Sequence, residues 1–204
     1  TRVRSSAASD VYKRQGYQLI TYDQRGAGDS SAAGGPASWQ QRGEDLWAVA
    51  DAAGIERAVL YGVFDGGHTA AHAAALRPER TLGLIFNRVP VHFTGQAGDT
   101  SGVPAAEVDA WFRPVGAGRE QALLAMTTLG IGRHESETME EAWGRAETPE
   151  AMACQASLLR DADLGPILPS LSMPALVLAR TRRSGRSGWA EPLAGLLPAA
   201  RLVR

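Results

Sequence analysis

Short apolar runs alternate along the chain with segments whose apolar residues have helical spacing. The runs at 17–22, 57–62 and 81–86 are rich in β-branched, aromatic and aliphatic residues, as buried strands are. The segments at 38–53 and 68–77 lie between them; the first has apolar residues at helical spacing, and the second is an alanine-rich helix pattern that ends before Pro78. Strands that are joined by helices through short links run in the same direction. The pattern therefore predicts a parallel sheet with crossover helices.

The alternation of predicted strands and helices is interrupted between residues 88 and 170. Gly and Pro gather at 95–104, and the following residues read as helices rather than strands. The helix-like stretches are 118–129, 135–145 and 149–160. The strand and helix pattern then resumes with a strand at 174–179, a helix at 189–197 and a strand at 201–203. We therefore expect a helical insertion between two strands of one sheet.

The first fifteen residues differ from the rest. Ser5–Gln15 reads SSAASDVYKRQ, which resembles a translated sequencing adapter, so we expect 1–15 to be a non-native tail outside the fold. The expected organisation is one domain with core segments at 16–87 and 171–204 and a helical cap insertion at 88–170. We further expect this domain to be truncated at both ends.

The amino-acid composition excludes several classes of function. The chain has 204 residues, 44% of them hydrophobic and 21% charged, with a net charge of −1. This balance offers no basic field for nucleic acid or an anionic membrane, and no apolar run is long enough to cross a bilayer. The single cysteine, Cys154, excludes a disulfide framework and a multi-cysteine zinc site. We expect a cytoplasmic protein that acts on or binds a small molecule, with no cofactor.

A sharp turn is predicted where the strand at 57–62 meets the next helix. Residues 62–67 read Gly-Val-Phe-Asp-Gly-Gly. A strand that feeds a helix through so tight a turn forces the central residue to a positive φ, and small residues must flank it because neighbouring backbone crowds in. The central residue is Phe64. Its side chain is expected to project at the carboxyl ends of the strands, where ligands bind in open α/β sheets.

Three segments together resemble the α/β-hydrolase fold family. They are YDQRGAGDS at 22–30, GIERAVLYGVFDGGHTAAHAAALRPER at 54–80 and LPSLSMPALVLARTRRSG at 168–185. The closest likeness is to the branch whose turn reads G-x-S-[DE]-G-G, some members of which are joined to cyclase or transcription-regulator domains. The resemblance implies a hydrolase of small esters or amides. In such enzymes a serine at the turn attacks the carbonyl, a His–Asp pair activates it and two backbone amides hold the oxyanion.

The reactive positions depart from that pattern. Phe64 stands at the nucleophile position and has no atom that can attack a carbonyl. Asp65 comes one residue late, so we interpret it as a first-turn carboxylate rather than an alternative nucleophile. Its backbone N–H is the oxyanion donor that the resemblance implies. Arg183 falls near the position of the triad acid, and the triad histidine would lie beyond residue 204.

Other polar residues are weaker candidates. Asp23, Arg25 and His92 follow predicted strands and are candidates to line the pocket, although Asp23 and Arg25 also suit a purely turn-stabilising role. His68 and His72 have the i, i+4 spacing of metal ligands, but no third ligand accompanies them, so no metal is expected. Apolar residues of the insertion form either a lid over the pocket or a small core of their own: Trp111, Phe112, Met126, Met139, Trp143 and Met152.

The sequence thus predicts an α/β-hydrolase family member that is inactive as written because Phe64 replaces the nucleophile. The alternative is a non-catalytic, hydrolase-like domain that binds a small ligand or regulates. Two origins of Phe64 stay open: a sequence error, since Ser and Phe codons differ by one base, and a true loss of the nucleophile. No nucleic acid and no membrane is expected as a partner.

Overall fold

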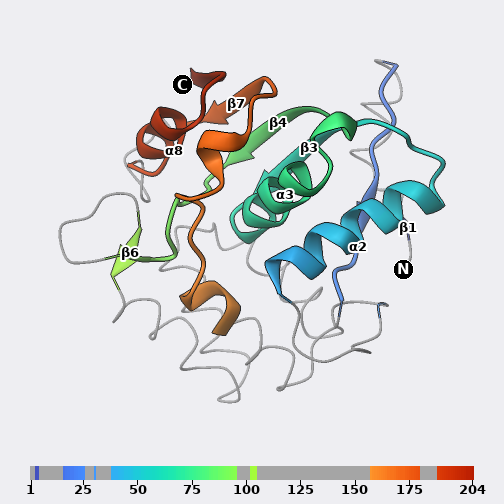
Figure 1. Cartoon of the computed structure of the whole chain (residues 1–204), viewed down its shortest axis with the longest axis horizontal. Helices are drawn as coiled ribbons and strands as arrows, with labels where there is room; N and C mark the ends of the chain where they lie inside the picture. Colours follow the sequence, from blue (N-terminus) through green and yellow to red (C-terminus); the bar gives the residue numbers. More distant parts are fainter. Residues whose placement is uncertain are drawn as a thin grey trace, which may run out of the picture.

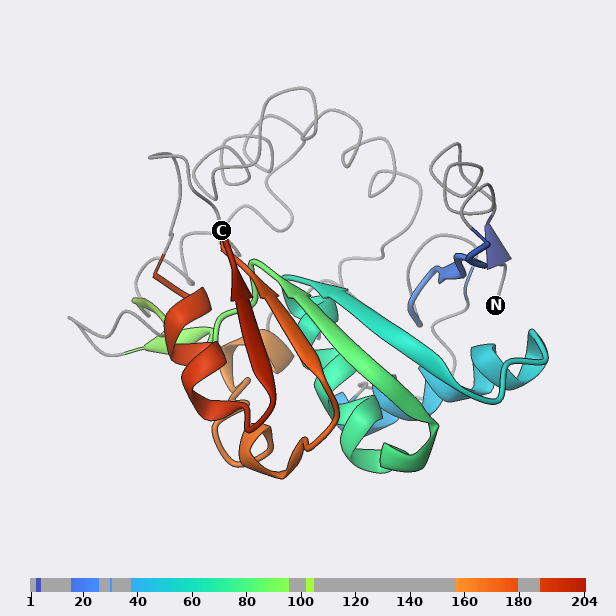
Figure 2. The same ribbon diagram turned by 90° about the horizontal axis from the view of Figure 1, so that it is seen from above.

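The computed structural model describes residues 3–4, 16–25, 30, 38–95, 102–104, 157–179 and 188–204. A four-stranded parallel sheet forms its centre, in the order β3 (Ala58–Val63), β4 (Thr81–Asn87), β7 (Ala175–Leu178) and β8 (Ala200–Val203). Figure 2 shows the four strands side by side, with their carboxyl ends at one edge. The predicted parallel sheet is confirmed for these strands.

Three helices form the second layer: α2 (Trp39–Ala52), α3 (Asp65–Leu76) and α8 (Ala190–Leu196). Figure 1 looks onto this layer. α2 begins after Ser38, whose hydroxyl accepts a hydrogen bond from the backbone N–H of Gln41, as a helix N-cap does. A single core joins the helices to one face of the sheet. Its members include Trp47, Leu60, Ala71, Ala74, Leu84, Phe86, Val177 and Leu193.

The described residues leave the opposite face of the sheet largely uncovered. Alternate residues of a strand point to opposite faces, and the outward members of β3 are exposed: Val59, Val63 and Tyr61, which keeps 54% of its surface. Leu82 of β4, Leu176 of β7 and Val203 of β8 are also exposed. All four strands thus present large apolar side chains to solvent.

The N-terminal elements differ from the prediction. Only Thr21–Tyr22 (β2) of the predicted strand at 17–22 is a strand, and it pairs in antiparallel fashion with Val3–Arg4 (β1) instead of joining the parallel sheet. Val3 and Arg4 lie within the tail that was expected to stand outside the fold. The pairing satisfies backbone groups of β2, which side-chain periodicity does not reveal.

α3 also begins earlier than its predicted start at His68. The turn predicted at 62–67 includes Gly66 and Gly67. Both lie inside the first turn of α3. Gly67 is needed there because a Cβ on it would run into the side chain of Val89. Close packing therefore overrides local helix propensity at this point.

Both ends of the predicted insertion contribute to the core of the sheet. Val89 and Val91 follow β4, and Leu164, Leu168 and Leu171 precede β7; all five are buried in the same cluster as α3. The short helix η2 (Leu168–Ser170) and the paired strands β5 (Thr94–Gly95) and β6 (Val103–Pro104) belong to these flanks. The predicted helices at 118–129 and 135–145 lie outside the described residues.

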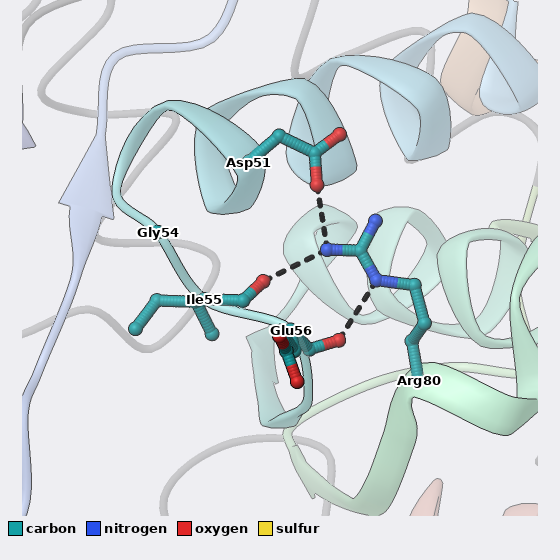
Figure 3. A pocket seen from close by; sticks show the side chains of 5 residues that line it. All are labelled: Asp51, Gly54, Ile55, Glu56 and Arg80. Carbon is teal, nitrogen blue, oxygen red and sulfur yellow. Dashed lines mark hydrogen bonds and ion pairs between the residues drawn. The ribbon is translucent and has the colours of Figure 1, made fainter.

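An arginine connects α2 to the amino-terminal edge of the sheet. Arg80, in the short helix η1 (Pro78–Arg80), donates hydrogen bonds to the backbone carbonyls of Ile55 and Glu56 at 2.8 Å each and to a carboxylate oxygen of Asp51 at 2.6 Å (Figure 3). Its guanidinium also lies over the Trp47 ring, 4.5 Å from the centroid. Arg80 borders an open depression of about 530 Å³ at the edge opposite Phe64. Because its donors are largely used within the protein, we interpret Arg80 as a structural clamp.

None of the helices in the described part of the chain is both long and apolar enough to cross a membrane.

Candidate active site

The turn between β3 and α3 has the strained geometry that the sequence predicts. β3 ends at Val63, α3 begins at Asp65, and Phe64 between them has φ 54° and ψ −118°. Its N–H donates to the carbonyl of Asn87 at the end of β4, and its carbonyl accepts from the N–H of Gly67, both at 3.1 Å. The backbone of Phe64 is therefore fixed from both sides in a conformation that non-glycine residues rarely adopt.

Backbone of α3 crosses Gly62 at very short range. A Cβ built on Gly62 would lie 2.6 Å from the carbonyl oxygen of Gly66 and 2.6 Å from the nitrogen of Gly67, and it would also meet the Gly67 Cα. All three atoms are backbone atoms that cannot rotate away. Glycine at 62 is thus a condition for bringing the N-terminus of α3 against the end of β3.

The Phe64 ring lies in an aromatic cluster. It packs edge-on against Phe93, with ring centroids 4.7 Å apart, and lies 6.0 Å from the Trp189 ring. Edge-to-face geometry at this distance is favourable. Phe93 and Trp189 are buried, as are Trp39, Leu159 and Ala162 in the same cluster. The side chain at the turn is therefore an apolar packing element.

Substitutions at Phe64 should separate packing from strain. Both Phe64→Ala and Phe64→Gly remove the ring, but only glycine relieves the positive φ, so we expect F64G to be more stable than F64A by about 1 kcal/mol. Phe93 is the matched control, because it lies in the same cluster without a positive φ. There the order should reverse, F93A being more stable than F93G. Urea unfolding of the four variants measures both differences; F64A as stable as F64G would show that the turn is unstrained.

Asp65 makes an ion pair across the helix layer. Its carboxylate lies 3.3 Å from the guanidinium of Arg42 in α2, and the two side chains are 20% and 8% exposed, respectively. Burial raises the pKa of Asp65, while the Arg42 charge and hydrogen bonds from the N–H groups of Asp65 and Gly66 lower it. Arg42 also lies 5.1 Å from the centroid of the Trp39 ring. The Asp65 carboxylate thus binds Arg42 of α2, and it lies in the first turn of α3 as expected.

His68 is a core residue. It is fully buried, and its Nε2 lies 3.0 Å from the carbonyl oxygen of Pro90. Burial lowers the pKa of His68 to about 3, so the ring is neutral at physiological pH. His72, one turn further on, stacks on Trp39 with ring centroids 6.2 Å apart, and burial lowers its pKa as well. No three potential ligands in the described part of the chain come together as a metal site.

His92 pairs with an acid from the far end of the insertion. Its Nδ1 lies 2.9 Å from Asp163 Oδ1, and the two side chains are 34% and 47% exposed. The same oxygen accepts the N–H of Gly165 at 2.7 Å. Backbone hydrogen bonds from Phe93 to Ala162 and from Leu164 to Val91 hold the two segments together. The carboxylate therefore orients the imidazole.

The chain is similar to known proteins in sequence and in fold. The family model for the alpha/beta hydrolase fold matches residues 5–127. The chain belongs to the α/β-hydrolase fold family. A 3-oxoadipate enol-lactonase from Acinetobacter baylyi is 34% identical over 182 residues, which cover 83% of this chain and 62% of the relative. The chain thus spans less than two thirds of the length of that enzyme.

Solved α/β-hydrolase structures agree with this fold. An esterase from Exiguobacterium antarcticum superposes with a TM-score of 0.83 at 21% identity, covering 96% of this chain and 75% of the esterase. An enol-lactonase from Burkholderia xenovorans gives a TM-score of 0.73 at 20% identity, covering 97% of this chain and 75% of that one. At these identities the likeness supports the α/β-hydrolase fold alone.

The other predicted site residues of this α/β-hydrolase are held by neighbouring elements. Arg25 makes two hydrogen bonds to Asp45 of α2, at 2.6 and 3.0 Å, and the carbonyl of Asp23 accepts the Ser30 hydroxyl. Nearby, burial and the Asp45 charge raise the pKa of Tyr22 to about 12. These contacts connect the turn after β2 to α2. Arg183 and the predicted lid residues lie outside the described residues.

Sequence reasoning missed Arg42 and Asp163. Arg42 lies three residues after Trp39 and four before Leu46, on the apolar face of α2, and a charge at such a position indicates a buried partner. That signal was present in the sequence. Asp163 had no local signal, because its partner His92 is far away in the chain.

Proposed function

We propose that the chain binds small esters or lactones without hydrolysing them. The observation that carries this proposal is Phe64, whose backbone has the positive φ of the turn while its side chain is an apolar ring packed on Phe93. Acyl transfer needs an oxygen or sulfur that attacks the carbonyl carbon. A benzyl group has neither lone pair nor acidic proton.

The described neighbours do not replace the missing nucleophile. The Asp65 carboxylate faces Arg42 rather than a ligand. His68 is enclosed in the core with Nε2 on the Pro90 carbonyl. His92 is oriented by Asp163, but an oriented base still needs a nucleophile to activate. Among the described residues, none near the turn can therefore form an acyl-enzyme.

The turn keeps a feature that suits a carbonyl ligand. α3 starts directly after Phe64, so its first backbone N–H groups and the positive end of its dipole lie at the carboxyl end of β3. In our proposal the ligand carbonyl displaces the Asp65 carboxylate from the N–H of Asp65, and the aromatic cluster contacts the apolar part of the ligand. The ligand class follows the Acinetobacter relative, whose name states action on an enol-lactone.

Hydrolysis of p-nitrophenyl acetate tests the loss of chemistry. We expect the purified chain to give no turnover above a boiled control, and clear turnover by the chain would overturn the proposal. Phe64→Ser serves as the matched variant. Turnover by F64S alone would show that position 64 by itself blocks the reaction.

Binding is tested separately by tryptophan fluorescence. Trp189 lies 6.0 Å from the Phe64 ring, so a ligand at the turn should change its emission. Titration with γ-butyrolactone should give a saturable change in the chain and none in Trp189→Phe. A linear or absent response would contradict lactone binding while leaving the loss of hydrolysis intact.

Ester or lactone hydrolysis is the second candidate function, and the strain at Phe64 favours it. A small residue fits φ 54° better than phenylalanine does, as expected if the position evolved for serine. The sequence of codon 64 in an intact genomic clone decides between the two. A serine codon supports the hydrolase, and a phenylalanine codon supports the non-catalytic binder.

A further inference from the structure

Some buried polar atoms of the core make no hydrogen bond within the described part of the chain. Four side-chain atoms in the described part of the chain are buried and make no hydrogen bond: Trp39 Nε1, His68 Nδ1, Thr69 Oγ1 and Thr94 Oγ1. Thr69 adjoins His68 in α3, and Thr94 adjoins Phe93, whose ring lies 4.9 Å from that of His68. Buried polar groups are nearly always hydrogen-bonded, to protein or to ordered water. Two of these exceptions, on the contacting rings of Trp39 and His68, therefore call for a common explanation.

The two ring nitrogens have opposite hydrogen-bonding character. The Pro90 carbonyl can only accept, so the neutral His68 ring must carry its proton on Nε2 and donate it there. Nδ1 is then a bare acceptor. Trp39 Nε1 is only a donor. A buried donor and a buried acceptor thus belong to two adjacent rings.

Trp39 and His68 are close but do not bond to each other. Their ring centroids are 5.0 Å apart, and the planes are inclined by 36°. This contact places the indole on the imidazole without directing its N–H at Nδ1. Burying a donor and an acceptor without hydrogen-bond partners would lower the stability of the folded protein by more than a typical hydrogen bond raises it.

The chemistry of the two atoms defines what they bind. A cation would be repelled by the indole N–H, and an anion by the lone pair of His68 Nδ1. The ligand must be neutral and small, and it must both accept and donate a hydrogen bond. Water meets these conditions, and buried waters commonly satisfy two to four such groups.

We propose that Trp39 Nε1–H and His68 Nδ1 bind one buried water molecule beneath the turn at Phe64. The water accepts from the indole and donates to the imidazole. The Phe93 ring contacts both His68 and Phe64, so this site adjoins the aromatic cluster at the turn. The site is independent of ester binding.

Water-selective NMR on the folded chain tests the site. We expect the indole proton of Trp39 to show a cross-peak with a long-lived water. Trp47 is the matched control, because its buried Nε1–H donates directly to the Ala73 carbonyl at 2.8 Å. A cross-peak at Trp39 alone supports the proposal. A missing cross-peak at Trp39, or equal cross-peaks at both indoles, would overturn it.

Two further readouts guard against misassignment. ¹⁵N shifts should show His68 protonated at Nε2 with Nδ1 as an acceptor; a proton on Nδ1 would contradict the site. A high-resolution crystal structure should show an oxygen within about 3 Å of both nitrogens. A protein acceptor on Trp39 Nε1 in that structure would equally refute the proposal.

Discussion

Replacing Gly62 with alanine should prevent the chain from reaching its folded structure. The added Cβ would overlap backbone atoms of Gly66 and Gly67 in the first turn of α3. Backbone cannot rotate away as a side chain can, so the strand and helix would have to separate. We expect a loss of about 4 kcal/mol or more, which is close to the whole stability of many domains. Circular dichroism and urea unfolding measure it.

Neighbouring glycines provide the controls for this variant. A Cβ on Gly66 meets nothing within 4 Å, so Gly66→Ala should leave stability unchanged or slightly raised. A Cβ on Gly67 would overlap the Val89 side chain, so Gly67→Ala should be destabilising and partly rescued by Val89→Ala. If G62A folded as well as G66A, the close approach of α3 to β3 would be refuted.

Removing the Arg42 charge should be the second most damaging change. Arg42→Met leaves the Asp65 carboxylate in a largely buried position without its counter-charge. Breaking a buried pair in this way costs about 3–5 kcal/mol, and the 20% exposure of Asp65 reduces our expectation to about 2–3 kcal/mol at pH 8. Arg204→Met is the control, because its pair with Glu191 is exposed and should contribute nothing measurable.

The cost of Arg42→Met should depend on pH. Burial already raises the pKa of Asp65, and loss of the guanidinium raises it further. When the pKa of a carboxyl is higher in the folded than in the unfolded protein, the free energy of unfolding falls as the pH rises from the unfolded pKa to the folded pKa. The variant should therefore approach the wild type as the pH falls through the raised folded pKa of Asp65. R42M combined with Asp65→Asn should remove this dependence; a cost independent of pH would exclude Asp65 as its source.

Local sequence patterns predicted most strands of the sheet, but they did not predict the contacts between residues that are far apart in the sequence. Continuous apolar runs predicted β3, β4 and β7, because such runs are typical of strands that carry apolar side chains on both faces. The turn at Phe64 was also predictable, since glycines at 62, 66 and 67 have few other uses together. The contact between Arg42 and Asp65 joins residues 23 apart, and no periodicity records which partner a charge will find.

The same limit explains the early elements. β2 was predicted as part of the parallel sheet because a β-prone run does not state its partner. The structure pairs it with Val3 and Arg4, within a segment whose composition indicated a foreign tail. Which strand pairs with β2 depends on which backbone N–H and C=O groups elsewhere in the chain still need hydrogen-bond partners. The local sequence of β2 does not contain this information.

The three described helices that pack on the sheet lie on a single face of it, and this has a practical consequence. Tyr61, Val59 and Leu176 lie on the other face, where a fluorescent probe such as anilinonaphthalene sulfonate has apolar surface to bind. Brightening of this dye is usually taken as a sign of a molten globule. In this protein the native state itself should brighten it, so thermal-shift scans based on such dyes will begin from a high baseline and should be replaced by circular dichroism.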